Sequence, residues 1–422
     1  MEARLFFEFL QVAIGNRECL SRELSDNDWQ DVFLLLKKHA LLGVGFTALE
    51  RLHIKGIVCP AKLRMHWYAL VVQIEKRNVQ LNALCKKVTE QYEHDGLSTC
   101  ILKGQGNLLN YPEELGVRRQ SGDIDVWATT INVCGIPIAV KAAKNTVEYV
   151  EYYGHKAIRE YVKMQFRQQG INIKPKACYH HIDAPAMDGI EVEVHYRPTF
   201  CRSFFRNYRM QKWFAAHASA CMKNLTSEGF SVPTASFNVV YQMAHLFEHY
   251  FEGGIGLRHM MDYYFTLCTW QKAIMDCKNT QSQGMWSEGL GTAVMSKEEV
   301  MAVLRSFGMG KFAAAVMYVL QEVFAMPTRQ LITDERLMIT DCPWLLCEPN
   351  EKEGKKLLEE IMKGGNFGQY DTRDAALKKG GMVKHGLWKL KRVMRLVSSY
   401  PEEALWEPVF RVWHLGWRKM NG

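Results

Sequence analysis

Several patterns that would define the class of this protein are missing from its sequence. Its 12 cysteines include no Cys-x-x-Cys pair, which argues against a disulfide framework or a zinc knuckle and favours reduced thiols. No run of uncharged residues is long enough to span a bilayer. The N-terminal apolar stretch, residues 5–10, has no basic lead and contains Glu8, so it predicts an amphipathic helix rather than a secretion signal. We therefore expect a soluble, cytoplasmic protein with no membrane partner.

Internal repeats and low-complexity tracts are also absent, which argues against a repeat array. At 422 residues and 48% apolar content, the chain is long enough for two or three domains with packed cores. The net charge of +8 and the isoelectric point of about 8.8 are moderately basic. Such a charge fits a polyanionic ligand such as a nucleotide or RNA, and it fits a solvated surface equally well.

Hydrophobic periodicity divides the chain into three regions. Residues 1–95 and 205–422 repeat apolar residues at helical spacing, whereas residues 96–204 contain alternating, strand-like runs. Asp26 or Asp28 is expected to cap an N-terminal helix. The sequence therefore predicts an α+β protein, with a small mixed sheet and its helices in residues 96–204 and helical regions on both sides.

The most informative segment is Gly122-Asp123-Ile124-Asp125-Val126, an Asp-x-Asp pair in a strand-like setting. Alternation along a strand places Asp123 and Asp125 on one face, with Ile124 and Val126 turned toward a core. Two such carboxylates are able to hold divalent cations jointly, the usual arrangement for phosphoryl and nucleotidyl transfer. The pair alone is also consistent with an acidic turn, so its meaning depends on the segments around it.

A glycine turn precedes this pair. Residues 98–102 read as a short strand that runs into Lys103-Gly104-Gln105-Gly106 and then into a helix-like run. A strand, a glycine turn and a helix start together expose backbone N–H groups that suit a phosphate. Lys103 is expected either to stabilise the β- and γ-phosphates or only to extend its ammonium group into solvent.

A later acidic strand completes the set. The Asp-Gly pair at residues 188–189 is a strong hairpin signal. The run that follows, residues 190–196, alternates strictly, so Glu191, Glu193 and His195 share one face. Glu193 is the preferred third carboxylate and Glu191 the alternative. His195 is expected to orient Glu193, to contact phosphate or to have only a structural role.

Basic residues lie ahead of the Asp-x-Asp strand and much further along the chain. Arg118 and Arg119 are placed to clamp phosphate oxygens, although an exposed basic turn explains them nearly as well. Arg258 and Asp262 are four residues apart and are expected to form a helix ion pair. The C-terminal mixture of lysine, arginine and tryptophan in residues 384–417 is consistent with RNA binding, but a solvated helix face explains it at least as well.

Together these segments resemble the uncharacterised nucleotidyltransferases of bacteria, which are relatives of the polymerase-β-like superfamily. The resemblance is clearest over residues 100–198, and its motifs are Leu102-Lys103-Gly104, Tyr111-Pro112, Arg118, Gly122-Asp123-Ile124-Asp125 and Glu193-Val194-His195. It implies that the middle region has the polymerase-β-like nucleotidyltransferase fold. The three regions of the chain are then an N-terminal helical region, a catalytic core and a C-terminal helical domain.

The resemblance also implies an activity, the transfer of NMP from an NTP to a hydroxyl acceptor with release of pyrophosphate. It implies two Mg²⁺ ions, with Mn²⁺ as a substitute, held by the catalytic residues Asp123, Asp125 and Glu193. Nucleotide contacts are expected from the glycine turn and its polar neighbours, namely Lys103, Gly104, Gln105, Gly106, Arg118 and His195. The acceptor is a small molecule, a sugar phosphate, a protein or, less favoured, a nucleic acid. Replacing Asp123 or Asp125 by alanine is expected to abolish transfer and to leave folding nearly intact.

Two alternatives from other classes stay open. Gln105 stands where the wider superfamily has serine or glycine, a departure that fits a nucleotide-binding protein without catalytic activity. The segment His245-x-x-Glu248-His249 matches H-x-x-E-H, the inverted zinc-protease motif, in which two histidines one helical turn apart chelate zinc. Such a protease needs a further acidic ligand, and the nearest candidate, Glu322, falls slightly short of the expected position. Nucleotidyl transfer is therefore the preferred interpretation.

Overall fold

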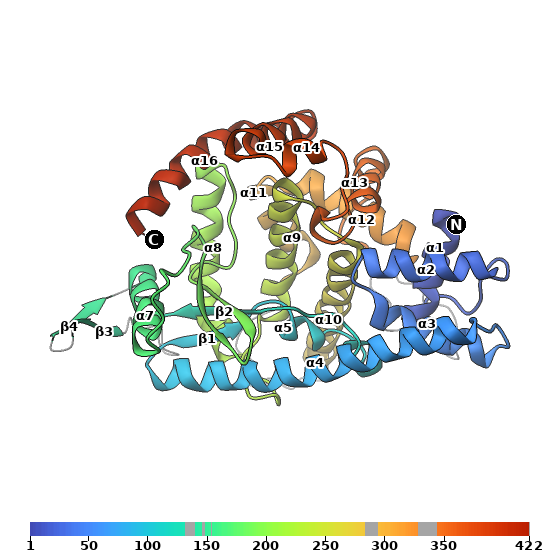
Figure 1. Ribbon diagram of the computed structural model, residues 1–422, viewed down its shortest axis with the longest axis horizontal. Helices are drawn as coiled ribbons and strands as arrows, with labels where there is room; N and C mark the ends of the chain where they lie inside the picture. The colour runs from blue at the N-terminus through green and yellow to red at the C-terminus, as the bar shows by residue number, and fades with distance from the viewer. Residues whose placement is uncertain (131–139, 146–147, 153, 283–293, 328–343, 422) are drawn as a thin grey trace.

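The computed structural model describes residues 1–130, 140–145, 148–152, 154–282, 294–327 and 344–421 (Figure 1). The N-terminal part is helical, as its periodicity predicts: α1 (Ala3–Ile14), α2 (Asp26–Lys38), α3 (Leu42–Ile54) and α4 (Ala61–His94). The long helix α4 begins directly after Pro60, whose missing N–H is harmless at a helix start.

The middle of the chain forms a four-stranded sheet with the strand order β1-β2-β6-β5. Its strands are β1 (Ser98–Ile101), β2 (Ile124–Thr129), β5 (His181–Met187) and β6 (Ile190–His195). The central strands β2 and β6 are parallel, and the two edge strands are antiparallel to them. The sheet is therefore mixed, as the sequence predicts. A separate two-stranded sheet contains β3 (Val140–Asn145) and β4 (Glu148–Tyr152).

The hairpin between β5 and β6 turns at Asp188 and Gly189, as predicted. Their φ angles are 51° and 75°, and positive values at both central residues are what a two-residue type I′ turn requires. A bulge between Ala184 and Met187 shifts the pairing by one residue, and this shifted register places His181 directly opposite His195. The turn and the bulge together therefore decide which polar side chains of the two strands lie side by side.

One face of the sheet packs against α4 and α7 (Gly154–Gln168), below and beside the strands in Figure 1. The core between them includes Val88 and Tyr92 of α4, Tyr161 of α7, Val126 of β2 and Val194 of β6. Burying each such side chain contributes roughly 1.5–3 kcal/mol. Because successive strand residues point to opposite faces, this packing turns Asp125 and Glu193 toward the other face of the sheet.

The rest of the described chain is helical. Two short helices, α5 (Gln105–Leu108) and α6 (Glu113–Gly116), connect β1 to β2. The later helices are α8 (Phe204–Lys223), α9 (Ala235–Glu252), α10 (Leu257–Ser282), α11 (Lys297–Ser306), α12 (Gly310–Phe324), α13 (Glu351–Gly364), η1 (Asn366–Gly368), α14 (Ala375–Lys378), α15 (Met382–Leu396) and α16 (Pro401–Asn421). The last two form an arch that extends from α13 toward α7 (Figure 1).

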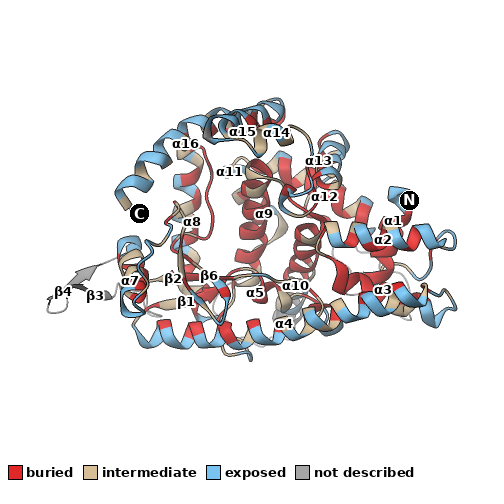
Figure 2. Cartoon of the chain, viewed as in Figure 1, coloured by how far each residue is buried: buried red, intermediate tan, exposed pale blue. Residues whose placement is uncertain are grey.

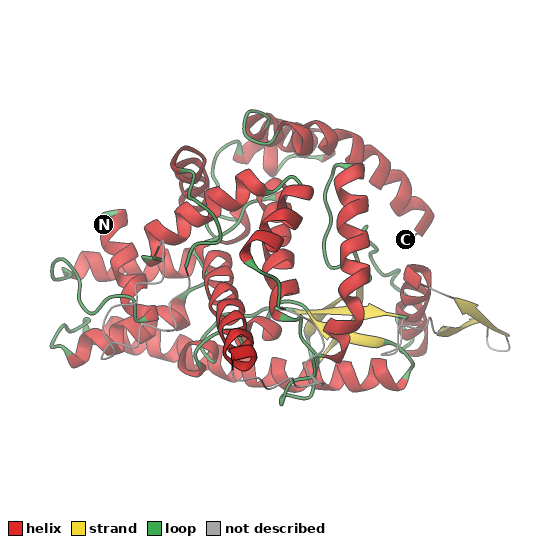
Figure 3. Ribbon diagram, turned by 180° about the vertical axis from the view of Figure 1, so that it is seen from behind, coloured by secondary structure: helices red, strands yellow, loops and turns green. Residues whose placement is uncertain are grey.

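Helix α9 lies inside this helical region and is buried along nearly its whole length (Figure 2). One apolar core joins α9, α10 and α12 to the N-terminal helices α1–α3. Seen from behind, the sheet is small beside the helices that surround it (Figure 3). The first and third regions therefore share a core, and boundaries near residues 95 and 204 stay a prediction.

The N-terminus of α2 differs from the sequence prediction. Ser25, and neither Asp26 nor Asp28, is the N-cap. The Ser25 hydroxyl accepts a hydrogen bond from the Asp28 N–H at 3.2 Å, and the Asp28 carboxylate accepts one from the Ser25 N–H at 3.0 Å. This reciprocal capping box satisfies two N–H groups at once, so the helix begins one residue earlier than an aspartate cap would allow.

Candidate functional site

Asp125 and Glu193 lie side by side on the sheet face that α4 and α7 leave free. They are register partners in the parallel pair β2–β6. One oxygen of each carboxylate lies within 4.8 Å of the other and of a ring nitrogen of His195. Asp125 is buried, with 1% of its surface exposed, and Glu193 is partly exposed. The structure therefore brings together two of the three predicted carboxylates and the predicted histidine.

Asp123, the remaining predicted carboxylate, stands just before β2 and is partly exposed. It lines the same cavity as Glu193 and His195. The charge of Asp125, together with burial and the charge of Glu193, raises the pKa of Asp123. Asp123 therefore belongs to the same cluster of negative charge.

Lys103 and His195 contact the most buried of these carboxylates. The Nζ atom of Lys103 lies 2.9 Å from Oδ1 of Asp125, and Nε2 of His195 lies 3.0 Å from the same oxygen. Burial opposes ionisation, yet Lys103 and His195 hold the pKa of Asp125 well below its usual range. His195 Nε2 is also 3.4 Å from Oε2 of Glu193. Burial raises the pKa of Glu193, but this contact and the charges of His181 and Lys103 together lower it to about 2. Both carboxylates are therefore ionised at neutral pH.

The glycine turn packs directly against the aspartate strand. Gly104 has a φ of +55°, and a Cβ atom there would lie 3.2 Å from the carbonyl oxygen of Asp123. A Cβ atom on Gly106 would lie only 2.5 Å from the carbonyl oxygen of Ile101. Residues with a side chain would push the turn away from β1 and from Asp123, so glycine is required at both positions.

The side chain of Gln105 points away from this turn. It is buried, and its amide donates hydrogen bonds to the carbonyl oxygen of Asn78 at 3.1 Å and to Oδ1 of Asn82 at 3.2 Å. Both acceptors belong to α4. Gln105 therefore holds the turn against α4, and a nucleotide contact at this position is left to the backbone.

The arginines differ most from the sequence interpretation. Arg118 forms ion pairs with Glu50 and Glu75, and it lines neither cavity of the site. Arg119 instead pairs through two nitrogens with Asp262, at 2.6 and 2.7 Å. The predicted ion pair between Arg258 and Asp262 is therefore wrong. Arg119, from a distant segment, pairs with Asp262 instead.

Arg258 faces the site. Its Nη1 donates to the carbonyl oxygen of Gln120 at 2.7 Å, whereas its buried Nε has no hydrogen-bond partner among the described residues. Burial, followed by the charge of Arg119, lowers the pKa of Arg258. Arg258 lines a small cavity of about 40 Å³ together with Lys103, Gly104 and Asp125. The sequence did not predict that Arg258 lines the site, because its i, i+4 spacing from Asp262 favoured an ion pair within the helix.

A larger cavity of about 790 Å³ opens on the other side of the carboxylates. Lys103, Asp123 and His245 line both cavities, so the two spaces adjoin. The sheet wall of the large cavity contributes residues such as Glu193 and His195. The helical wall, from α9, α15 and α16, contributes His245, Glu248, His249, Lys389, Arg411 and His414.

The H-x-x-E-H residues line this helical wall but do not form the zinc site of a protease. Glu248 accepts a hydrogen bond from the Thr199 hydroxyl. Among the described residues, no group of three converging metal-binding side chains includes His245 or His249. Glu322, the candidate third ligand, is exposed on α12. Within the described part of the chain, the motif therefore has no third ligand.

The basic C-terminal segment is divided between several roles. Trp388 and Arg392 are buried, and Arg392 donates to the carbonyl oxygen of Tyr250 at 2.6 Å. Lys391 pairs with Asp374 at 2.5 Å, and Lys389 lines the large cavity. Several basic residues of the segment are therefore engaged in contacts that hold α15 against its neighbours. This weakens the case for an RNA-binding surface.

Two further histidines were missed by the sequence interpretation. His180 and His181 lie beside His195 and line the large cavity. The available signal was the Asp-Gly turn, but the pairing beside that turn would place Ile182 opposite His195. The bulge between Ala184 and Met187 brings His181 there instead, so predicting this histidine required the position of the bulge.

Comparisons with known proteins agree with this geometry. A family model described as "Uncharacterised nucleotidyltransferase" matches residues 25–284, more than half of the chain. No curated protein and no solved structure matches the chain. Within the part of the chain that the structure describes, no helix has the length and apolar character needed to cross a membrane. The matched span contains the sheet, the glycine turn and the carboxylates, and the chain belongs to this family of uncharacterised nucleotidyltransferases.

Proposed function

We propose that this protein is a metal-dependent nucleotidyltransferase that moves NMP from an NTP to a hydroxyl acceptor and releases pyrophosphate. The observation that carries the proposal is the meeting of Asp125 and Glu193 on adjacent parallel strands, with Asp123 in the same cluster. The family match supports nucleotidyl transfer in general. A cytoplasmic location, where NTPs are abundant, is part of the proposal.

The donor set fits Mg²⁺ or Mn²⁺, because ionised carboxylate oxygens are the ligands that these cations prefer. Asp123, Asp125 and Glu193 would hold two such ions. When bound, the ions supply positive charge to the attacking and leaving oxygens of an in-line displacement. Lys103 supplies positive charge to Asp125 in this structure, and His195 contacts the same oxygen, so part of the negative charge is already balanced.

The nucleotide triphosphate is assigned to the smaller cavity. Gly104 brings the backbone of the turn against Asp123, and Lys103 and Arg258 place two cations at the same cavity. Among the residues that the structure describes, Nε of Arg258 has no partner, so it is able to donate to a phosphate oxygen. Positive groups fixed in place before the reaction stabilise the charge that develops on the phosphates.

The acceptor is assigned to the larger cavity, which Glu193 lines. Glu193 is ionised, since its pKa is about 2, and it is therefore ready to accept a hydrogen bond from the attacking hydroxyl and to orient it. The helical wall of α9, α15 and α16 closes the opposite side and would select the acceptor. Candidate acceptors are a sugar phosphate, a small molecule, a protein hydroxyl and an RNA end.

Parallel measurements of NTP binding and pyrophosphate release test the proposal. The purified chain is incubated with Mg²⁺, each NTP in turn and a cell extract that supplies acceptors. We expect binding and pyrophosphate release with at least one NTP. Binding without pyrophosphate release would contradict the proposal and favour a nucleotide-binding protein without catalytic activity.

A further inference from the structure

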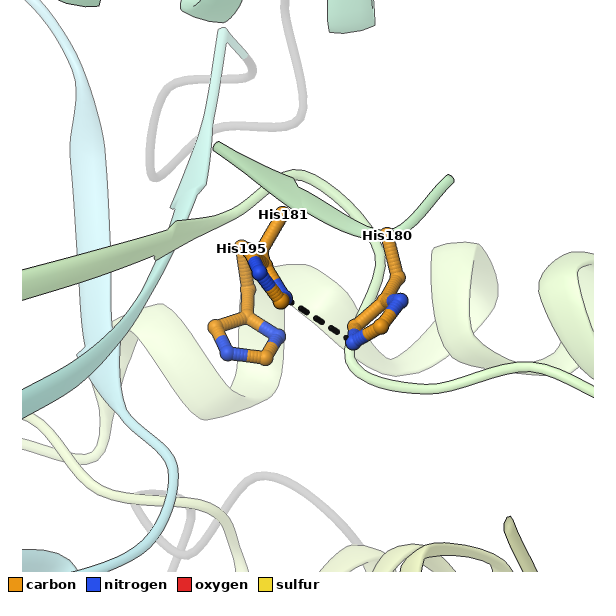
Figure 4. A group of neighbouring side chains, drawn as sticks. All are labelled: His180, His181 and His195. Atoms are coloured by element: carbon orange, nitrogen blue, oxygen red, sulfur yellow. Dashed lines mark hydrogen bonds between the residues drawn. The ribbon is translucent and has the colours of Figure 1, made fainter. Parts of the chain in front are cut away.

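Three imidazole rings meet at one point of the large cavity. His180 directly precedes β5, His181 begins β5, and His195 ends β6. One ring nitrogen of each lies within 4.8 Å of the other two. Figure 4 shows the three rings gathered around the same space, with a 3.0 Å contact between Nδ1 of His181 and Nε2 of His180. The backbone register, with His181 opposite His195, produces this arrangement.

In two of the three rings, one nitrogen contacts a carboxylate. Nε2 of His181 lies 3.4 Å from Oδ1 of Asp183, and Nε2 of His195 lies 3.0 Å from Oδ1 of Asp125. A carboxylate on one ring nitrogen is the usual partner of a histidine whose other nitrogen binds a metal. Histidine rings without such partners would be free to rotate, so these contacts hold the cluster in place.

One nitrogen of the cluster has no partner. Nδ1 of His195 is buried and has no hydrogen bond among the described residues, and buried polar atoms are rarely left unsatisfied in folded proteins. The His180 nitrogen that faces the cluster is Nε2, which contacts Nδ1 of His181. A bound cation would use the free lone pair of His195 and replace the contact between His180 and His181, with release of ring protons.

The donor set differs from that of the carboxylate site. Imidazole nitrogens suit Zn²⁺, Co²⁺ and similar ions, whereas Mg²⁺ prefers oxygen ligands. Three histidines with a fourth position open to a cavity are also a common arrangement for zinc. Glu193 Oε2 lies 3.5 Å from Nδ1 of His181, so the histidine cluster adjoins the proposed acceptor side of the site.

We propose that His180, His181 and His195 bind one transition-metal ion of the Zn²⁺ class, separate from the Mg²⁺-type ions of the carboxylates. Its position beside Glu193 gives it a role in binding an acceptor, and that role rests on the proposed function. Binding of the ion does not depend on the proposed function, because it is measured with the metal alone.

The test is metal binding by the full chain after removal of metals with a chelator. Co²⁺ is titrated and followed by its visible absorption, and Zn²⁺ is then added as a competitor. We expect one Co²⁺ per chain, displaced by Zn²⁺ but not by millimolar Mg²⁺. The His180→Ala and His181→Ala variants should each weaken binding by more than about tenfold. His94→Ala is the matched control, because the His94 ring is 89% exposed and distant in sequence from the cluster.

Several outcomes would overturn the proposal. One is a wild-type chain that binds less than one Co²⁺ or Zn²⁺, which needs no variant. Another is a His180→Ala chain that binds as tightly as the wild type, and His180→Asn replaces it if circular dichroism shows that the alanine variant is unfolded. Loss of zinc in His249→Ala but not in His180→Ala would move the site to α9. Asp123→Asn should keep the zinc and lose nucleotidyl transfer, so the two proposals fail separately.

Discussion

A histidine and a glutamate on each wall of the large cavity titrate in opposite directions. On the sheet wall, interactions with opposite charges outweigh burial: they raise the pKa of His181 to about 10 and lower that of Glu193 to about 2. On the helical wall, burial prevails: it lowers the pKa of His249 to about 4 and raises that of Glu248 to about 7. Burial also lowers the pKa of His180 on the sheet side, so the neighbouring charges, and not the residue type or the wall alone, decide the pKa of each group.

This difference separates the assigned tasks. The sheet wall presents ionised Glu193 beside Asp125, which suits metal ions and phosphates. The helical wall presents His245 and His249, whose pKa values burial lowers, beside Lys389 and Arg411, which suits the binding of a polar acceptor. Substitutions on the sheet wall should therefore lower turnover, and substitutions on the helical wall should change acceptor binding or stability.

The largest effect is expected from the two aspartates. Asp123→Asn should lower turnover by about 10³-fold, comparable to the removal of one fixed electrostatic group from an active site. Its fold should stay intact, because Asp123 is partly exposed. Pyrophosphate release and thermal denaturation measure the two properties. Full turnover in Asp123→Asn would contradict the assignment.

Asp125 should behave differently from Asp123. Its carboxylate is buried against Lys103 and His195, so Asp125→Asn or Asp125→Ala leaves the partly buried ammonium group of Lys103 without its main partner. Breaking a fully buried pair costs about 3–5 kcal/mol, and the cost here should be lower because 18% of the Lys103 side chain is exposed. The sequence predicted that Asp125→Ala would leave folding nearly intact. The structure instead predicts a loss of stability, so the melting temperature of Asp125→Ala should be lower than that of Asp123→Asn.

Glu193 and Glu191 provide a matched pair on one strand face. Glu193→Gln should lower kcat by about 10²-fold, because it removes the carboxylate that lies beside Asp125 and His195. Glu191 is exposed, so Glu191→Gln should change kcat by less than about twofold, within the small effect of most surface substitutions. If Glu191→Gln were the more damaging substitution, the third carboxylate would have to be reassigned.

Arg258 and Arg118 provide a second matched pair. Arg258→Ala should raise the KM for the NTP by about 10- to 100-fold, as expected when a charged hydrogen bond to phosphate is lost. Arg118→Ala should lower the melting temperature by breaking its pairs with Glu50 and Glu75, while KM stays unchanged. An equal rise in KM for both variants would show that Arg258 has no special role.

The pH dependence of stability should distinguish the histidines of the two walls. Between pH 6.5 and about 4, the unfolded chain binds a proton at His249 that the folded chain does not. His249 therefore lowers the free energy of unfolding as the pH falls, by up to about 1.4 kcal/mol per pH unit. His181 has a raised pKa, so it contributes stability below pH 6.5 that is lost as the pH rises toward about 10.

Chemical denaturation with a chelator present measures this contrast. His249→Asn should flatten the loss of stability between pH 6.5 and about 4. His181→Asn should remove the fall in stability on the alkaline side, between pH 6.5 and about 10. If both variants changed the pH dependence of the free energy of unfolding in the same way, the opposite pKa shifts of His181 and His249 would be contradicted.

The sheet wall was largely predictable from the sequence. Strand alternation and the Asp-Gly turn are local signals, and they fixed the faces of Asp125 and Glu193 before any contact was known. The cations around the small cavity were not predictable in this way. Arg258 was assigned to Asp262 by its spacing, but Arg119 occupies that carboxylate from another segment. Such contacts depend on how distant elements pack, which residue spacing does not record.

The most direct test of nucleotidyl transfer compares the fate of two labels. NTP labelled at the α-phosphate and NTP labelled at the γ-phosphate are incubated separately with the chain, Mg²⁺ and a cell extract. We predict that the α-label moves to the acceptor, that the γ-label leaves in pyrophosphate, and that Asp123→Asn abolishes both. Transfer of the γ-label to the acceptor, or equal transfer by Asp123→Asn, would contradict the account.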